Sequence, residues 1–267
     1  TVRGEAESTE RFAAVQRYIL AGDCYQINLA QRFSARYQGD EWQAYLKLRE
    51  ATPTPFSGFM AWGSQAVLSL SPERFIQCRD GLVETRPIKG TRPRGRTPEE
   101  DRALSDELLS STKDRAENVM IVDLLRNDLG RVCTPGSIRV PQLCQLESYP
   151  NVHHLVSVVQ GQLAAQHSPL SLLTAAFPGG SITGAPKIRA MQIIDELEPC
   201  QRSVYCGSLG YIDVRGSMDT SIAIRTMVAD DGALYVWGGG GLVADSKADE
   251  EYTETLDKIR HLIDALE

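Results

Sequence analysis

The sequence predicts an α+β fold in which mixed, largely antiparallel sheets are layered with helices. Polar and apolar residues alternate along residues 24–37, which is the two-residue period of a strand with one buried face. Strand-like and helix-like segments then follow in mixed runs, without the strict alternation that a parallel sheet requires. No repeat or linker divides the 267 residues, so we expect one domain over residues 1–267.

The first part of the chain is expected to begin with a helix and to continue with strands. Apolar residues at helical spacing over residues 8–21, followed by Gly22, predict an amphipathic helix closed by a glycine cap. The polar face of the strand at 24–37, which includes Gln26 and Asn28, either lines a site or meets water. Shorter strands are predicted at 56–62, 66–70, 74–79 and 82–87, with a hairpin turn at Asp80 and Gly81 between the last two.

Helices and strands are also expected in the rest of the chain. The composition of residues 98–127, rich in Leu, Ala, Glu and Asp, predicts two helices with a break near residues 110–112. Strands are predicted at about 152–163, 203–214, 219–229 and 233–237, and helices near 169–177, 184–197 and 248–265.

Composition excludes several classes of protein. The formal net charge of −7 disfavours general nucleic-acid binding, which needs clustered Lys and Arg. No run approaches the roughly 20 apolar residues of a membrane span, and the first residues lack a secretion-signal pattern, so we expect a cytoplasmic protein with no membrane association. The six cysteines lie far apart without a Cys-x-x-Cys pair, which favours reduced thiols over a zinc site or disulfide framework.

Acidic residues on two predicted helices are candidates for metal binding. Glu117 falls on the same helical stripe as Ile121 and Leu124, so its carboxylate points toward the core, where either Mg²⁺ or a basic residue could balance it. In the last helix a helical wheel places Glu251 beside the apolar stripe and Glu254 opposite it. Acidic residues at a helix start also commonly compensate the helix dipole, which is the alternative here.

Two glycine-rich segments could receive anions through backbone amides. Four consecutive glycines, residues 238–241, follow an apolar strand and would let a ligand approach the main chain, although a flexible turn is the alternative. In residues 178–187, Thr183 is expected to cap a helix with Pro186 in its first turn, which places Lys187 and the positive end of the helix beside the loop.

Further polar residues could serve as catalytic groups. Glu73 follows a predicted strand, where a general acid could stand, although such a residue is commonly solvated. His153 and His154 are neighbours in a strand, so at most one faces a given site. Lys89 has an apolar, rigid setting between Pro87 and Gly90 that could expose a nucleophilic amine, and a surface lysine at a strand end is the alternative.

Taken together, ordered motifs over nearly the whole chain resemble the chorismate-utilising enzyme family. The first group is GDCYQINL at 22–29, SLSPERF at 69–75, RPIKGT at 86–91, KDRAEN at 113–118 and FPGGSITGAPK at 177–187. The second group is VHHL at 152–155, GSLGY at 207–211, MDTSI at 218–222, IRT at 224–226 and GGGLVADS at 239–246. The resemblance implies that residues 1–267 form the family's chorismate-binding catalytic domain.

Differences between branches of the family imply a particular reaction. Branches that add water to chorismate carry a lysine where this chain has Gln26. The anthranilate-forming branch typically reads Pro-Ile-Ala-Gly-Thr, whereas the branch that makes 4-amino-4-deoxychorismate reads Pro-Ile-Lys-Gly-Thr, as residues 87–91 do. The resemblance therefore implies a transferase of the transaminase class that serves para-aminobenzoate and folate biosynthesis, with the anthranilate-forming reaction as the alternative.

The resemblance also implies roles for the candidate catalytic residues. Glu73 protonates the departing C4 hydroxyl while Lys89 attacks C2 of chorismate, and ammonia then displaces the lysine. Glu117 and Glu254 match the family's Mg²⁺ ligands, so for the second ligand the resemblance overrides the helical wheel. Glu251 and Asp114 are expected near the ion, and His154 is expected close to the ring.

The remaining implications concern substrate, partner and regulation. Chorismate is expected to contact Gly90, Thr91, Thr183, Lys187, Tyr211, Arg225, Gly239, Gly240 and Gly241. Ammonia is expected to come from a glutamine amidotransferase subunit. Full-length members begin with a further N-terminal segment, which we expect to be missing here. Pro55, Phe56 and Ser57 match the remaining edge of a regulatory or tryptophan pocket.

Overall fold

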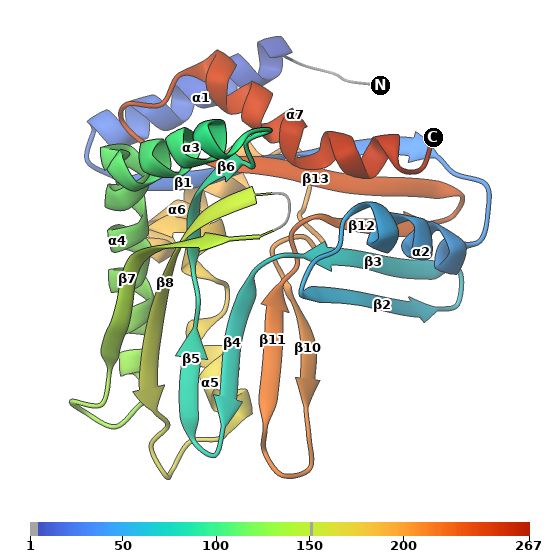
Figure 1. Cartoon of the computed structure of the whole chain (residues 1–267). Coiled ribbons are helices and arrows are strands. Elements are labelled where there is room, and N and C mark those ends of the chain that lie inside the picture. The colour runs from blue at the N-terminus through green and yellow to red at the C-terminus, as the bar shows by residue number, and fades with distance from the viewer. Residues whose placement is uncertain (1–4, 150–151) are drawn as a thin grey trace. The chain divides into compact units, whose positions relative to one another are not determined.

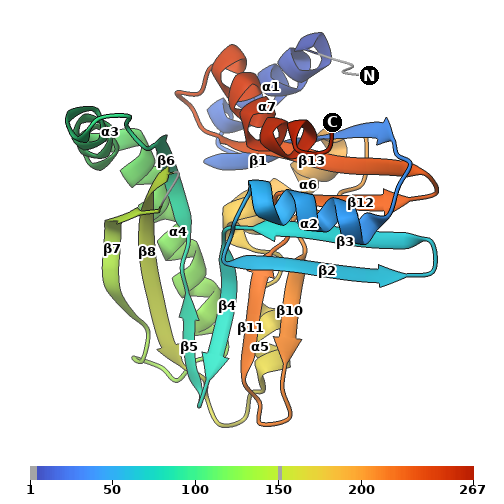
Figure 2. The same ribbon diagram turned by 45° about the vertical axis from the view of Figure 1, so that its right-hand side comes forward.

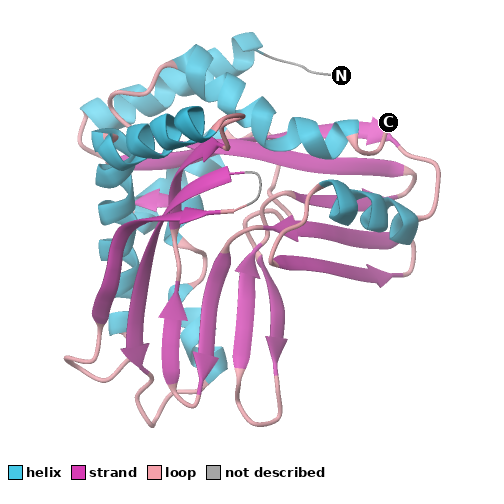
Figure 3. Ribbon diagram, in the orientation of Figure 1, coloured by secondary structure: helices cyan, strands magenta, loops and turns pink. Residues whose placement is uncertain are grey.

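The computed structural model describes residues 5–149 and 152–267 and confirms an α+β fold with antiparallel sheets (Figure 3). The chain divides into two compact units, each assembled from separate stretches of sequence. Unit 1 comprises Thr1–Pro72, Pro178–Leu209 and Ser221–Glu267, and unit 2 comprises Glu73–Phe177 and Gly210–Thr220. Because each unit is discontinuous, no linker in the sequence marks its limits. Among the described residues, no helix has the length and apolar character needed to cross a membrane.

Unit 1 is built on a six-stranded sheet in the order β2-β3-β12-β13-β1-β9 (Figure 1). The strands are β1 (Gln26–Arg36), β2 (Phe56–Trp62), β3 (Gln65–Ser71), β9 (Gly184–Ala185), β12 (Thr226–Asp230) and β13 (Ala233–Leu242). The central pair is long and antiparallel, with Ile27 opposite Leu242 and Arg36 opposite Ala233. The predicted strand at 24–37 is therefore confirmed.

Four helices accompany this sheet, namely α1 (Glu5–Leu20), α2 (Glu41–Ala51), α6 (Lys187–Leu197) and α7 (Ala248–Asp264). One core cluster packs Leu48 of α2 and Ile259 of α7 against Leu68 and Val236 of the sheet. A second cluster joins α1 and α6 to Ile27 of β1. Because side chains alternate along a strand, Gln26 and Asn28 lie on the opposite face of β1 from Ile27.

Unit 2 is built on a second antiparallel sheet, in the order β10-β11-β4-β5-β8-β6, with β7 also pairing with β8 (Figure 2). The strands are β4 (Arg74–Arg79), β5 (Leu82–Thr85), β6 (Ile88–Pro93), β7 (Arg139–Ser148), β8 (Val152–Gln162), β10 (Ser208–Ile212) and β11 (Met218–Ile222). The Asp80–Gly81 hairpin is confirmed, since both residues have positive φ, at 50° and 76°.

The helices of unit 2 are α3 (Pro98–Ser110), α4 (Thr112–Gly130) and α5 (Pro169–Ala176). The predicted break between the first two is confirmed, because Ser111 ends α3 and its side chain accepts from the Asp114 amide as the N-cap of α4. Asn118 of α4 donates to the Leu155 carbonyl of β8 at 3.1 Å and also bonds Ser157. These buried bonds fix α4 against the sheet.

Several elements differ from the sequence prediction. The segment 219–229 forms two strands in different sheets, because Arg225 adopts a φ of +48° between β11 and β12. The last predicted strand extends through the glycines to Leu242, and β10 begins only at Ser208. The prediction had no counterpart for α2, β6, β7 or β9.

Candidate active site

Lys89 lies within β6, rather than at the end of a surface strand. Its side chain is only 12% exposed, and its Nζ lies 3.8 Å from Oε2 of Glu117, whose side chain is 14% exposed. The expected apolar setting is thus incomplete, because a carboxylate faces the amine. Gly90 follows with a φ of +83°, and a Cβ there would stand 2.8 Å from Leu108 and 3.0 Å from Asp114, so only glycine fits.

Glu117 is placed opposite Lys89 by the packing of α4. Its neighbour Asn118 is fully buried and bonded to β8, while Ile121 and Val122 are buried one turn further along. The prediction that the Glu117 carboxylate points inward is confirmed. The carboxylate faces a basic residue, Lys89, which was not considered as its partner from the sequence.

The two neighbouring histidines have different partners, as expected for a strand. His154 is 6% exposed and its Nδ1 lies 2.9 Å from Oγ1 of Thr91, its opposite neighbour on β6. The ring of Tyr149 stands 5.7 Å from the His154 ring. The structure therefore gathers Lys89, Glu117, Thr91 and His154 around β6.

His153 belongs to a separate polar cluster that anchors α3. Its Nε2 lies 3.0 Å from Oδ1 of Asp101, and its Nδ1 lies 2.8 Å from Oγ of Ser148. Arg94 donates twice to the Asp101 carboxylate, at 2.7 and 2.8 Å. This hydrogen bonding holds the pKa of Asp101 well below its usual range.

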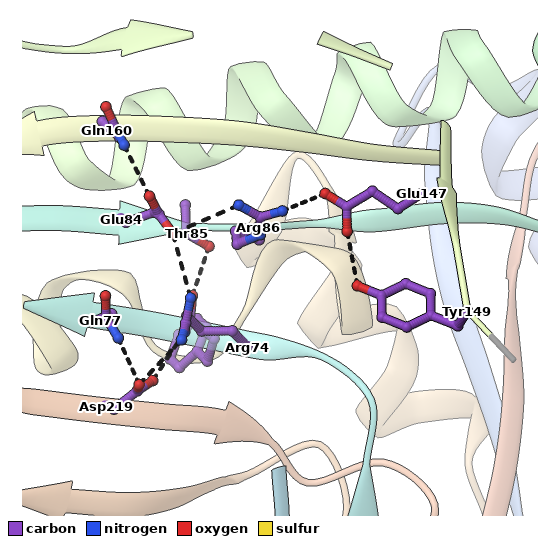
Figure 4. Close-up of polar contacts among 10 residues, drawn as sticks. Arg74, Gln77, Glu84, Thr85, Arg86, Glu147, Tyr149, Gln160 and Asp219 are labelled. Carbon is purple, nitrogen blue, oxygen red and sulfur yellow. Dashed lines mark hydrogen bonds and ion pairs between the residues drawn. The ribbon is translucent and has the colours of Figure 1, made fainter. Parts of the chain in front are cut away.

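A ladder of charged side chains crosses one face of the unit 2 sheet, as Figure 4 shows. Arg74 on β4 pairs with Asp219 on β11 at 3.0 Å and with Glu84 on β5 at 3.3 Å. Arg86, from the motif that contains Lys89, pairs with both Glu84 and Glu147.

The ladder ends beside His154. Glu147 Oε2 accepts from the Tyr149 hydroxyl at 2.8 Å, and burial together with Glu147 raises the pKa of Tyr149. Because the Tyr149 ring neighbours His154, the ladder connects to the catalytic candidates. Sequence reasoning missed this connection, since the residues are scattered and follow no motif.

The two other candidates in unit 2 have contrasting exposure. Glu73 is 6% exposed between β3 and β4, so it is not the solvated residue of the alternative interpretation. Tyr211 lies in β10 and is 55% exposed.

In unit 1, β1 buries two amide side chains. Gln26 and Asn28 are 1% and 7% exposed, so this part of the polar face does not simply meet water. Within the described part of the chain, Gln26 Oε1 and Asn28 Nδ2 have no hydrogen-bond partner. Buried polar atoms of this kind usually bond a protein group, a water molecule or a ligand.

The loop at 177–187 folds differently from the expectation. Thr183 does not cap the helix, because its hydroxyl donates to the Gly179 carbonyl at 2.9 Å within a short 3₁₀ turn, Gly180–Ile182. Pro186 is the residue before α6, with no side-chain cap, and Lys187 begins the helix. Gly184 and Ala185 form β9 in between, so the loop is bound to the edge of β1.

The glycine run lies in β13, and α7 packs closely on it. A Cβ on Gly238 would stand 2.8 Å from the Thr255 carbonyl oxygen, and one on Gly240 would stand 3.0 Å from Glu251 Oε2. These glycines therefore permit helix packing, and residues 238–241 form a strand instead of the flexible turn.

The two glutamates of α7 differ as the helical wheel suggested. Glu251 is 7% exposed and accepts from the Ser246 hydroxyl at 2.6 Å. The Glu254 side chain is 54% exposed and pairs with Lys258 at 2.7 Å. Lys258, which sequence reasoning missed, also donates to the Gly239 carbonyl at 3.0 Å.

Arg225 is a partly buried cation between β11 and β12. Burial lowers its pKa. The pKa of His261 in α7 is lowered, mainly by burial and secondly by the positive charge of Arg225. Separately, Pro55 and Ser57 line an open hollow together with Tyr45, Arg49, Pro53 and Thr54, and Phe56 begins β2 beside it.

The carboxylates singled out from the sequence are of the ligand type that Mg²⁺ takes. Among the described residues, no three His, Cys, Asp or Glu side chains gather into a ready metal cluster. Mg²⁺ is commonly held by one or two carboxylates with waters and substrate oxygens, whereas zinc takes closed sets of four protein ligands. Glu117 of unit 2 and Glu251 and Glu254 of unit 1 provide carboxylates of this kind.

Comparison with known proteins assigns the family. Residues 4–264 match the model for chorismate binding enzymes. Aminodeoxychorismate synthase component 1 of Klebsiella aerogenes is 58% identical over 261 residues, which cover 98% of this chain and 58% of the relative. Anthranilate synthase component 1 of Aquifex aeolicus is 46% identical over 252 residues, which cover 94% of this chain and 51% of the relative.

The structural comparison agrees. The crystal structure of anthranilate synthase component I from Streptococcus pneumoniae matches with a TM-score of 0.90 and 38% identity, covering 98% of this chain and 58% of that one. The chain thus spans little more than half the length of these proteins. With this fold, these motifs and a family match over nearly all of its residues, the chain belongs to the chorismate-binding enzyme family.

Proposed function

We propose that this chain carries the catalytic machinery of an aminodeoxychorismate synthase component 1, which converts chorismate and ammonia to 4-amino-4-deoxychorismate. The observation that carries the proposal is Lys89, which is largely buried in β6 with its amine 3.8 Å from the Glu117 carboxylate. A lysine held at such a place is a candidate nucleophile. The higher identity to an aminodeoxychorismate synthase than to an anthranilate synthase supports the same choice.

The proposed reaction has two displacements. The Lys89 amine bonds to C2 of chorismate, both ring double bonds shift, and the C4 hydroxyl leaves as water after Glu73 protonates it. Ammonia then bonds to C4, both double bonds shift back, and the lysine amine departs. His154, held by Thr91 at 2.9 Å, is proposed to stand beside the ring as a polar partner for the substrate.

Substrate and metal binding complete the proposal. Gly90, Thr91, Tyr211, Thr183, Lys187, Arg225 and Gly239 to Gly241 are proposed to contact chorismate. Arg225 can grip a carboxylate through its planar guanidinium. Glu117 and Glu254 are proposed to hold Mg²⁺, with Glu251 and Asp114 near it. The ion would neutralise a carboxylate of the substrate, which an acidic protein needs.

An ammonia source and a cellular setting follow from the proposed reaction. The name component 1 of the relatives implies a second component. We propose that this partner is a glutamine amidotransferase that releases ammonia, and that the pair works in the cytoplasm in para-aminobenzoate synthesis. Tryptophan binding at the hollow beside Pro55 is proposed only for a protein of the full length of its relatives.

The decisive experiment identifies the product and the adduct. The protein is incubated with chorismate, Mg²⁺ and ammonium, and we expect aminodeoxychorismate with a transient mass adduct on Lys89. Lys89→Ala should abolish amination, whereas Lys247→Ala, which removes an exposed lysine that also pairs with a glutamate at 2.7 Å, should not. Fluorescent anthranilate as the product, or full amination by Lys89→Ala, would refute the proposal.

A further inference from the structure

A buried ion pair lies directly behind the loop that supplies Thr183. Glu198 is the residue after α6, and Arg202 follows four residues later. The guanidinium donates to the carboxylate twice, at 2.9 Å from Nε and 2.6 Å from Nη2. Only 15% of the Arg202 side chain and 6% of the Glu198 side chain are exposed. An ion pair with two hydrogen bonds fixes both the position and the orientation of the Arg202 guanidinium relative to the Glu198 carboxylate.

Both partners of this pair also bond the backbone of two other segments. Arg202 donates to the Ile182 carbonyl at 2.7 Å and to the Asn28 carbonyl at 2.6 Å. Glu198 accepts from the Ala30 amide at 2.8 Å. β9 pairs with β1 only at Gln26 and Ile27. Beyond the end of β9, the ion pair supplies the hydrogen-bond partners for the edge of β1, at the Asn28 carbonyl and the Ala30 amide.

The same contacts determine where Thr183 stands. Ile182, held by Arg202, is its chain neighbour, and the Asn28 amide donates to the Thr183 carbonyl at 2.8 Å. The 3₁₀ turn is therefore held to β1 through both backbone groups of Asn28, because its amide bonds Thr183 and its carbonyl shares Arg202 with Ile182. The buried amides of Gln26 and Asn28 lie on the same stretch of strand.

Energetics favour a geometric role for the pair over a stabilising one. Desolvation of two buried charges cancels most of their attraction, so such a pair contributes little net stability. What it can supply is a single arrangement of the segments that it joins, because each of its donors and acceptors has a fixed direction. A hydrophobic pair of equal volume would leave the carbonyls of Asn28 and Ile182 without these donors.

We propose that Glu198 and Arg202 are positioning residues that lock the 180–183 turn onto the edge of β1 and so set Thr183 relative to Gln26 and Asn28 for substrate binding. The proposal rests on the proposed function, in which Thr183 contacts chorismate. Neither residue touches the substrate. Their contribution is a preformed loop, so their loss should weaken binding before it slows the chemistry.

The test compares Arg202→Lys with Arg189→Lys. Lysine keeps the charge but cannot donate to both carbonyls and both carboxylate oxygens, because it lacks the guanidinium fork. Arg189 is the matched control, since it also joins α6 to the segment before β1, through Asp23 at 2.8 Å, but is one-third exposed. We expect Arg202→Lys to raise KM for chorismate by about tenfold with kcat changed far less, and Arg189→Lys to change neither.

Amide hydrogen exchange provides a readout that is independent of activity. In Arg202→Lys, exchange should accelerate in residues 178–186 and 26–30 but not in α7. If Arg202→Lys fails to fold, Glu198→Asp, which keeps the charge and shortens its reach, takes its place. Slow exchange in the loop with an unchanged KM, in a folded variant of either residue, would overturn the proposal. If the unaltered protein binds no chorismate, the proposed function fails, while hydrogen exchange still decides the locking of the loop.

Discussion

The glycines at 238–241 of β13 offer a test of how closely α7 must pack on this strand. Gly238 and Gly240 face the same helix, and neither has a positive φ, so both tolerate alanine as far as backbone conformation is concerned. At Gly238 the new Cβ would stand 2.8 Å from the Thr255 carbonyl oxygen, which is 0.6 Å inside the 3.4 Å of an ordinary contact. At Gly240 the obstacle is Oε2 of Glu251 at 3.0 Å.

The two obstacles differ in their freedom to move. The Thr255 carbonyl belongs to the helix backbone, so Gly238→Ala must push α7 outward, and overpacking of this kind costs about 2 kcal/mol. The Glu251 carboxylate can rotate aside, and alanine in a strand gains roughly 0.5–1 kcal/mol over glycine. We therefore expect Gly238→Ala to lower the free energy of unfolding by about 2 kcal/mol, and Gly240→Ala to leave it unchanged or slightly higher.

Urea denaturation measures this difference, provided that the slope of unfolding free energy against urea stays constant between variants. Chorismate binding, measured on the same samples, adds a second comparison. Gly240→Ala should weaken chorismate binding, because it displaces Glu251 and adds a methyl group to the strand that is proposed to contact the substrate. Equal destabilisation by the two alanines would refute the packing argument, because it would show that the helix yields as easily as a side chain.

Three further predictions concern unit 2. Asp101→Asn should destabilise the protein at neutral pH, because the Asp101 pKa is lowered in the folded state; its stabilisation is present above the ordinary carboxyl pKa of about 4 and fades as pH falls below it. Thermal melts from neutral to acidic pH should thus converge for the two proteins. Thr91→Val should leave the fold intact but lower kcat/KM, since His154 loses its 2.9 Å partner, and Thr91→Ser should restore it. Ser111→Ala should cost about 1 kcal/mol in urea denaturation as α4 loses its cap, whereas Ser105→Ala, which removes no cap from the middle of α3, should cost little.

The parts of the fold that the sequence predicted well are those governed by local chemistry. Alternation along β1 reports a strand with one buried face, and Asp80–Gly81 supplies the positive φ that a tight hairpin needs. Ser111 is a good N-cap, so a helix break could be placed there from composition alone. The inward direction of Glu117 followed from helical spacing and the burial of Ile121.

The parts that could not be predicted depend on tertiary contacts. The change of sheet at Arg225 requires a positive φ that arginine rarely adopts, so no local signal marks it. Thr183 has the side chain of a helix cap, but pairing of Gly184 with β1 separates it from α6. The partner of Glu117 could not be chosen either, because Lys89 is brought to it by the packing of α4 on a strand of distant sequence.

The contact between Lys89 and Glu117 changes how a lysine deletion must be interpreted. Lys89→Ala removes the proposed nucleophile, but it also takes a cation from beside a carboxylate that is only 14% exposed, which costs stability or reorganises α4. Glu117→Gln in the same chain removes that imbalance and keeps the shape of the side chain. Because Glu117 is also a proposed Mg²⁺ ligand, the double variant is compared by thermal stability and not by activity. A melting temperature that falls in Lys89→Ala and recovers in the double variant assigns the lost stability to the unbalanced carboxylate.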